Sequence, residues 1–320
     1  MRIPVLLPLL LSPSLVLADV PSAMERFLGS SRPDYDPAQL EADTVDSGRD
    51  FAPFSPADSD LGVQQILGEY KGLPPVRVEV SSDFYWTDNA PSPTRATDEK
   101  SWLWAGRVAL SWQPKIAAGW FADVGVEEQW FRFDQGDATD FEYFAAHAGV
   151  LKMLPSLDDL LVYGRLEFQM LSTGSFGDSD YSANRIRFGA QKVLVNTPHH
   201  HLSAGVSGAF DFDADRENLQ RNEYTLDLSY TYFIADSLSA TASWRGSIWD
   251  FNSSVGAGAF REDRRDFNQV VGVELTWLPC KNARISTSVF FSDNDSNTPL
   301  GANDSQVWTV GLGVGAVFEF

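Results

Sequence analysis

The sequence has few of the features that identify common classes of protein. Of its 320 residues one is a cysteine, Cys280, so no disulfide can form within the chain. Cys280 falls in a predicted short turn and is expected to have no role of its own. The chain has 24 lysine and arginine residues against 44 aspartates and glutamates, a formal net charge of -20. This balance argues against nucleic acid as a partner, because binding it needs basic patches.

Long hydrophobic runs are missing beyond the first eighteen residues. Mean hydropathy is close to neutral, which argues against a bundle of transmembrane helices. One apolar run, Val5 to Leu17, follows Arg2 and ends at Val16-Leu17-Ala18. It is too short to span a bilayer and ends in a small-residue cleavage site, so residues 1–18 are predicted to be a cleaved secretory signal peptide.

The chain instead shows a regular alternation of apolar and polar residues. About twelve segments between Val76 and Phe320 carry apolar residues at every second position, close to the length that a tilted transmembrane strand needs. The last segment is the clearest, because its two rows differ in bulk. The bulky row is Gln306, Trp308, Val310, Leu312, Val314, Ala316, Phe318 and Phe320, and the row between is small or polar. Such a strand has lipid on one side and a crowded or wet interior on the other.

The connections between these segments alternate in length. Long polar connections are predicted at Thr87–Glu99, Asp134–Asp140, Ser172–Asp180, Asp213–Arg221, Asp250–Arg264 and Asp293–Asp304. Short ones are predicted at 113–115, 155–157, 196–198, 235–237 and 279–282. A membrane barrel whose long loops all lie at one end has this pattern. A soluble β-sandwich or propeller is the alternative, but neither requires aromatics collected at strand ends, and no blade-length repeat is present.

The signal peptide, the turn pattern and a last strand ending on Phe320 together resemble bacterial outer-membrane β-barrel proteins. The resemblance covers residues 76–320, is porin-like, and identifies no single family. It implies an all-β fold: a transmembrane antiparallel up-and-down barrel of about twelve strands, in the outer membrane of a Gram-negative bacterium. It also implies contact with outer-membrane lipid and lipopolysaccharide, and with the barrel-assembly machinery.

Two segments precede the barrel. Residues 19–57 are acidic and rich in proline, which predicts a disordered periplasmic tail, with a plug or a partner-docking arm as the alternative. Residues 58–75 are predicted to form a short helix and linker. The helix would carry Leu61, Ile66, Leu67 and Tyr70 and is a candidate plug for the barrel mouth, or equally an interfacial or idle segment.

If the bulky rows face lipid, the other rows bring charged residues into the interior. Folding each hairpin about its centre aligns Glu79 with Arg107, Glu127 with His147, and His147 with Arg165. It aligns Arg187 with both Arg165 and Ser207, Asp227 with both Ser207 and Arg245, and Glu167 with Arg185, to within about two residues. The predicted pore-lining residues are Glu79, Arg107, Glu127, His147, Arg165, Glu167, Arg185, Arg187, Asp227 and Arg245.

This belt has two interpretations. Opposite charges can pair and hold the register of a barrel that has little apolar core. They can also form a selectivity band, in which Arg165, Arg187 and His147 make a positive patch that attracts anions. Twelve strands give a barrel with a backbone radius of about 12 Å. Inward side chains would then leave either a narrow pore or a closed interior that does not conduct.

Signals for catalysis or metal binding are weak, and we expect neither an enzyme nor a cofactor. His199, His200 and His201 adjoin a short turn without further ligands of fitting geometry. Two sets of acidic residues, Asp211 with Asp213 and Asp215, and Asp293 with Asp295 and Asn297, lack the glycine and distal glutamate of a helical calcium loop. They are expected to be acidic loop tips that could bridge to lipopolysaccharide through divalent cations.

The function predicted from the sequence is a porin-like channel for small solutes, with anions as a candidate class. A structural or surface-interaction protein that does not conduct is the alternative. An export barrel is less favoured because residues 19–75 are too few for a large passenger.

Overall fold

The computed structural model describes residues 75–88, 100–134, 140–157, 160–172, 181–215, 219–251, 264–297 and 304–320. The predicted signal peptide (1–18), the acidic tail (19–57) and the candidate plug residues Leu61, Ile66, Leu67 and Tyr70 lie outside this part. No helix in the described ranges is long and apolar enough to cross a membrane.

The described chain consists of strands and one 3₁₀ turn, η1 (Pro155–Leu157). The strands are β1 (Val76–Thr87), β2 (Ser101–Trp112), β3 (Lys115–Ala117), β4 (Trp120–Phe133), β5 (Phe141–Leu154), β6 (Leu160–Ser172), β7 (Tyr181–Asn196), β8 (His200–Ala214), β9 (Arg221–Ala235), β10 (Leu238–Phe251), β11 (Arg265–Cys280), β12 (Ala283–Ser296) and β13 (Ser305–Glu319). Except for β3 they have 12 to 16 residues, so the prediction of about twelve long strands is confirmed.

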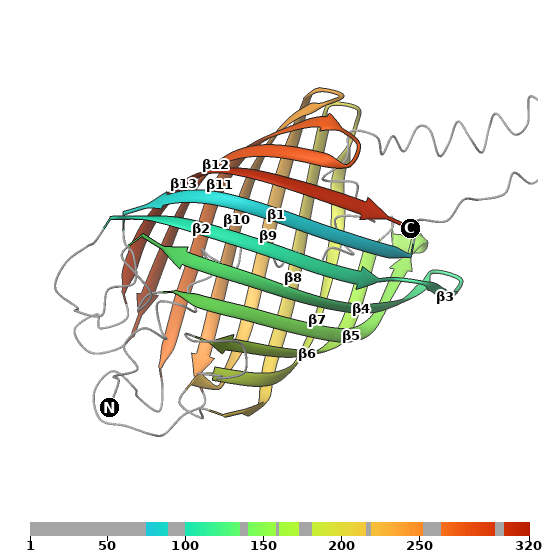
Figure 1. Ribbon diagram of the computed structural model, residues 1–320. Helices are drawn as coiled ribbons and strands as arrows, with labels where there is room; N and C mark the ends of the chain where they lie inside the picture. Colours follow the sequence, from blue (N-terminus) through green and yellow to red (C-terminus); the bar gives the residue numbers. More distant parts are fainter. Residues whose placement is uncertain are drawn as a thin grey trace, which may run out of the picture.

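The twelve long strands form one closed antiparallel ring. Each pairs with the next in sequence, with β4 following β2, and β13 pairs with β1 to close the barrel. At this seam Val76 and Phe320 exchange two backbone hydrogen bonds, of 3.2 and 3.0 Å. Figure 1 shows β1 lying between β13 and β2, and Phe320 at the same end of the barrel as β3. Every strand therefore has two neighbours, and the sheet has no open edge.

The two rows of each strand face opposite sides of this wall. On β13, Trp308, Leu312 and Phe318 are exposed, whereas Thr309 and Gly313 between them are buried. The same parity holds around the ring, so the outer surface is apolar, as in Val206 of β8 and Val273 of β11. The predicted partition is confirmed: bulky apolar rows lie outside and polar rows inside.

Connection lengths agree with the sequence pattern except at the turn after β2. There, residues 113–119 form a small extension in which β3 pairs with the start of β4. Gly119 has a φ of 71°, a conformation that glycine adopts at no steric cost. We call the end of the barrel with β3 the short-turn end and the opposite end the long-loop end.

Candidate functional site

Charged side chains line the inner face between the two ends and link strand to strand. On β1, β2 and β4, Arg107 lies between two carboxylates, with its Nη1 2.6 Å from Glu79 Oε2 and its Nη2 2.6 Å from Glu127 Oε2. Arg77 also pairs with Glu79, and the Gln129 amide donates to Glu127. Three predicted residues, Glu79, Arg107 and Glu127, thus form one network.

His147 lies apart from the arginines with which the sequence placed it. Its Nε2 lies 3.4 Å from Asp123 Oδ1 on β4, and the Gln113 amide donates to the same oxygen at 2.8 Å. Asp123 was not among the predicted residues, although it shares the inward parity of Glu127.

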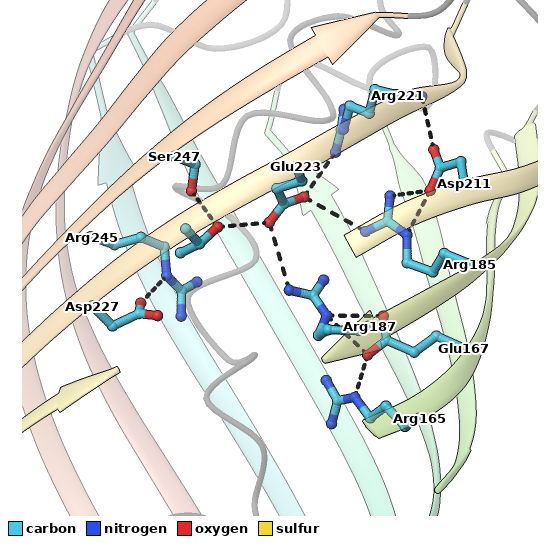
Figure 2. Close-up of polar contacts among 11 residues, drawn as sticks. Arg165, Glu167, Arg185, Arg187, Asp211, Arg221, Glu223, Asp227, Arg245 and Ser247 are labelled. Carbon is cyan, nitrogen blue, oxygen red and sulfur yellow. Dashed lines mark hydrogen bonds and ion pairs between the residues drawn. The ribbon is translucent and has the colours of Figure 1, made fainter. Parts of the chain in front are cut away.

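The largest group of charges lies on β6 to β10, where Figure 2 shows the side chains gathered on one face of these strands. Glu167 contacts both Arg165 and Arg187, with Arg187 Nε 3.0 Å from its Oε1. Because Arg165 and Arg187 are directly opposite each other, this carboxylate offsets the repulsion of two guanidinium groups. The expected positive patch is thereby partly neutralised.

Three members of this group were not predicted from the sequence to line the interior: Asp211, Arg221 and Glu223. Asp211 on β8 lies 2.8 Å from Arg185 Nη2. Glu223 on β9 lies 3.6 Å from Arg185, 3.7 Å from Arg187 and 3.9 Å from Arg221. The expectation that Asp211 is a loop tip is wrong, because β8 extends to Ala214 and brings this carboxylate inside the wall. The alternation that puts Phe210 and Phe212 on the outer row puts Asp211 on the inner row, and this was the signal that could have found it.

The group ends on β9 and β10. Arg245 Nε lies 2.6 Å from Asp227 Oδ1, and these residues are directly opposite, as predicted. Beside this pair, the Thr225 hydroxyl lies 3.1 Å from Glu223 and 2.9 Å from the Ser247 hydroxyl, so it links β9 to β10 (Figure 2). We call the set on β6 to β10 the charged cluster: Arg165, Glu167, Arg185, Arg187, Asp211, Arg221, Glu223, Asp227 and Arg245.

The register predictions succeed for some hairpins and fail for others. The alignments of Arg165 with Arg187, Glu167 with Arg185, and Asp227 with Arg245 are confirmed. The remaining alignments are displaced by two residues, so that Ser81 faces Arg107, Gly125 faces His147, Glu167 faces His147, Ala209 faces Arg187 and Thr225 faces Ser207. Hairpin centres differ slightly from the middle of each connection, and bulges shift β7 against β8. An even displacement keeps the residue on the same face.

The inner face of β10 to β13 and β1 is built from smaller residues. Ser243, Ser286 and Ser288 lie on it, and β13 contributes glycines at 311, 313 and 315. A Cβ atom on Gly313 would lie 1.9 Å from Asp83 Oδ1, so Asp83 lies across the glycine. Tyr85 lies across Gly311 in the same way. Its large side chains include Trp249 and Phe251 near the long-loop end of β10, and Phe290, which lies across Gly272. We call this side of the interior the thinner wall.

Apolar residues also face inward near the long-loop end. The core cluster there comprises Leu103, Phe131, Phe133, Phe141, Leu171, Tyr181, Ala183 and Leu219. Phe131 and Phe141 stack with ring centroids 4.4 Å apart. This long-loop cluster lies on β2 and β4 to β7, beside the charged cluster, and adds to the bulk of that side of the interior.

No metal centre is found in the described ranges, where no three His, Cys, Asp or Glu side chains meet in an arrangement that could hold an ion. Of the histidine run, His200 packs on the rings of Tyr230 and Tyr232. His201 is buried on the opposite face of the same strand. The free thiol of Cys280 is exposed.

The inward side chains halfway along the strands are not packed tightly enough to exclude solvent. Glu127, His147, Asp227 and Arg245 all remain partly exposed, although their parity points them away from the outer surface. Solvent therefore reaches the interior at this level, which we call the waist.

Comparison with known proteins gives a fold and no family. Neither a family model nor a curated protein matches the sequence. Among solved structures, an outer-membrane channel from Pseudomonas putida F1 has a TM-score of 0.53 at 11% identity, covering 78% of this chain and 98% of the channel. The NanC porin (TM-score 0.43, 11% identity, 75% and 98% covered) and the translocator domain of the autotransporter NalP from Neisseria meningitidis (0.42, 11%, 79% and 90%) are more distant. Scores this low carry no argument. The first likeness and the closed ring agree that the chain has the fold of an outer-membrane β-barrel.

Proposed function

We propose that this protein is an outer-membrane channel for small polar solutes, exported with a cleaved signal peptide. The observation that carries the proposal is the waist, where polar side chains face the interior and remain open to solvent. A barrel with only a structural role would be expected to have an interior filled by side chains from every strand. The proposal assigns no catalytic residue and needs no cofactor.

The passage would run beside the inner face of β10 to β13 and β1. Small residues and side chains laid across Gly311 and Gly313 leave the most room there. The charged cluster and the long-loop cluster occupy the other side. The bore is therefore expected to lie off the barrel axis.

A preference for anions, which the sequence suggested, is weakly supported. It rested on Arg165, Arg187 and His147 acting together, but Glu167 bridges the two arginines and His147 lies against Asp123. Partners proposed from the fold are outer-membrane lipid and lipopolysaccharide, with divalent cations at acidic positions such as Asp293 and Asp295, and the barrel-assembly machinery during folding.

A non-conducting role is the second candidate, and the long-loop cluster favours it. Buried rings such as Phe131 and Phe141 narrow one end of the interior. If they close it together with the charged cluster, the barrel would serve as a scaffold for its loops.

Planar-bilayer recording with the purified full chain separates the two candidates. A channel gives stepwise conductance, and Ser286→Trp, which puts a ring inside the wall at β12, should lower each step by roughly half because conduction depends on pore diameter. Ile285→Trp adds the same ring to the outer face of the same strand and should leave the steps unchanged. A wild-type protein that inserts and gives no steps would remove the channel proposal.

A further inference from the structure

The ion pairs inside the barrel are not symmetrical with respect to solvent. In the charged cluster the carboxylate is generally the more exposed partner. Exposed fractions are 3% for Arg165 and 11% for Glu167, 7% for Arg221 and 14% for Glu223, and 16% for Arg245 and 32% for Asp227. The guanidinium groups lie against the wall, and their partners stand between them and the solvent.

Three pairs depart from this rule. Asp211 and Asp266 are wholly buried beside Arg185 and Arg264, so both members of these pairs are withdrawn from the passage. His147 is more exposed than Asp123, at 22% against 1%. In the network on β1, β2 and β4 the exposures are close to equal, with Arg107 at 15% between Glu79 at 12% and Glu127 at 18%.

The thinner wall adds carboxylates that have no cation within ion-pair distance. Asp83 on β1 accepts a hydrogen bond from the Ser81 hydroxyl at 3.0 Å, and Glu274 on β11 accepts one from the Thr276 hydroxyl at 2.7 Å. Among the residues that the structure describes, neither forms an ion pair, and both are partly exposed. Of the guanidinium groups on this wall, those of Arg77 and Arg245 pair with Glu79 and Asp227, and that of Arg284 lies across Gly315. Asp83 and Glu274 thus add negative charge to the interior beyond that of the ion pairs.

From these two observations we infer that the channel prefers cations, both small inorganic ions and solutes that carry an amine. This inference rests on the proposed function and names its solute class. Charge that solvent can reach sets the local concentration of permeant ions, and a ring of Asp and Glu favours cations. The arginines of the charged cluster contribute less to the passage than their number suggests, because Glu167, Glu223 and Asp227 are more exposed than the guanidinium groups that they contact.

The test is the reversal potential of the wild-type channel in a planar bilayer under a KCl gradient. We expect a permeability ratio of K⁺ over Cl⁻ of roughly three or more, since a cleft lined by one sign of charge concentrates the opposite ion. The double variant Asp83→Asn/Glu274→Gln should lower the ratio toward one while the conductance steps persist. Both substitutions keep size and hydrogen-bonding capacity, so the barrel should fold.

Asp250→Asn is the matched control. Asp250 lies on the outward row at the long-loop end of β10 and pairs with Arg265, so its loss removes one acidic charge away from the passage. The ratio should stay at the wild-type value. A reversal potential of the sign expected for Cl⁻, or a ratio unchanged in the double variant, would overturn the inference and leave the channel standing. Absence of any conductance would instead overturn the channel proposal, and this inference with it.

Discussion

The inner faces of two halves of the barrel are built differently, although their outer faces are alike. On β2 and β4 to β9 the interior carries the long-loop cluster, the charged cluster except Arg245, and a second apolar contact between Leu151 and Leu161. On β10 to β13 and β1 it carries mainly serine, threonine and glycine, with Tyr85 and Asp83 folded flat against the wall. Lipid imposes the same outer surface on every strand, so the two halves differ only inside.

The difference separates two requirements of such a barrel. Interlocked side chains on β4 to β9 hold neighbouring strands in register, because Arg185 and Arg187 each contact carboxylates from two strands. The thinner half leaves space and presents hydroxyl groups and unpaired carboxylates. We therefore expect substitutions in the first half to affect stability most, and substitutions in the second half to affect conduction most.

The largest effect is expected from Glu167→Gln. It leaves Arg165 and Arg187 facing each other without the carboxylate between them, and breaking a buried ion network costs about 3–5 kcal/mol. Urea-induced unfolding in lipid vesicles would measure the change. Glu274→Gln in the thinner half is the control and should cost less than about 1 kcal/mol. Equal losses for the two variants would show that the halves do not differ in the way proposed.

An intermediate effect is expected from Gly311→Val. The new Cβ would meet the Tyr85 ring at 2.1 Å and must push it into the interior, at a cost of about 1–3 kcal/mol. Replacing Tyr85 by Ala in the same chain should recover much of that loss, which a double-mutant cycle on unfolding measures. Strictly additive losses would mean that the ring does not lie across the glycine.

The smallest effect is expected from Arg265→Gln. Its ion pair with Asp250 has side chains that are 62% and 38% exposed, and solvent screens a pair so open to water. The same unfolding assay should give a stability indistinguishable from that of the wild type. A loss as large as that of Glu167→Gln would remove the contrast between paired charges inside and outside the barrel.

The barrel, its strand number and the side on which each residue lies could be predicted because they depend on parity. A period of two survives any even error in pairing, so Arg245 and Glu79 face inward whether or not their partners are correctly named. The loop pattern is equally local, since proline, glycine and acidic residues mark it along the sequence.

The contacts within the site depend on the register of each hairpin and on side-chain conformation, which the alternation of residues does not determine. His147 meets Asp123 and not Arg165, because the β4–β5 and β5–β6 hairpins each turn about a centre displaced from the estimate. Asp211 was missed because it was assigned to a loop tip, and Glu223 because no hairpin alignment was extended to the long-loop end of β9. Which member of a pair is exposed, the basis of the cation preference, depends on side-chain conformations that no spacing encodes.

The hydrogen bonds between Val76 and Phe320 have a consequence for how the molecule is made. Partners separated by almost 250 positions along the polypeptide must meet before the ring is sealed, which is a contact of very long range and slow to form. Until synthesis reaches the final strand, the first has one neighbour instead of two, and its free backbone groups need protection from aggregation. Closure of this barrel must therefore wait until the whole chain has been made.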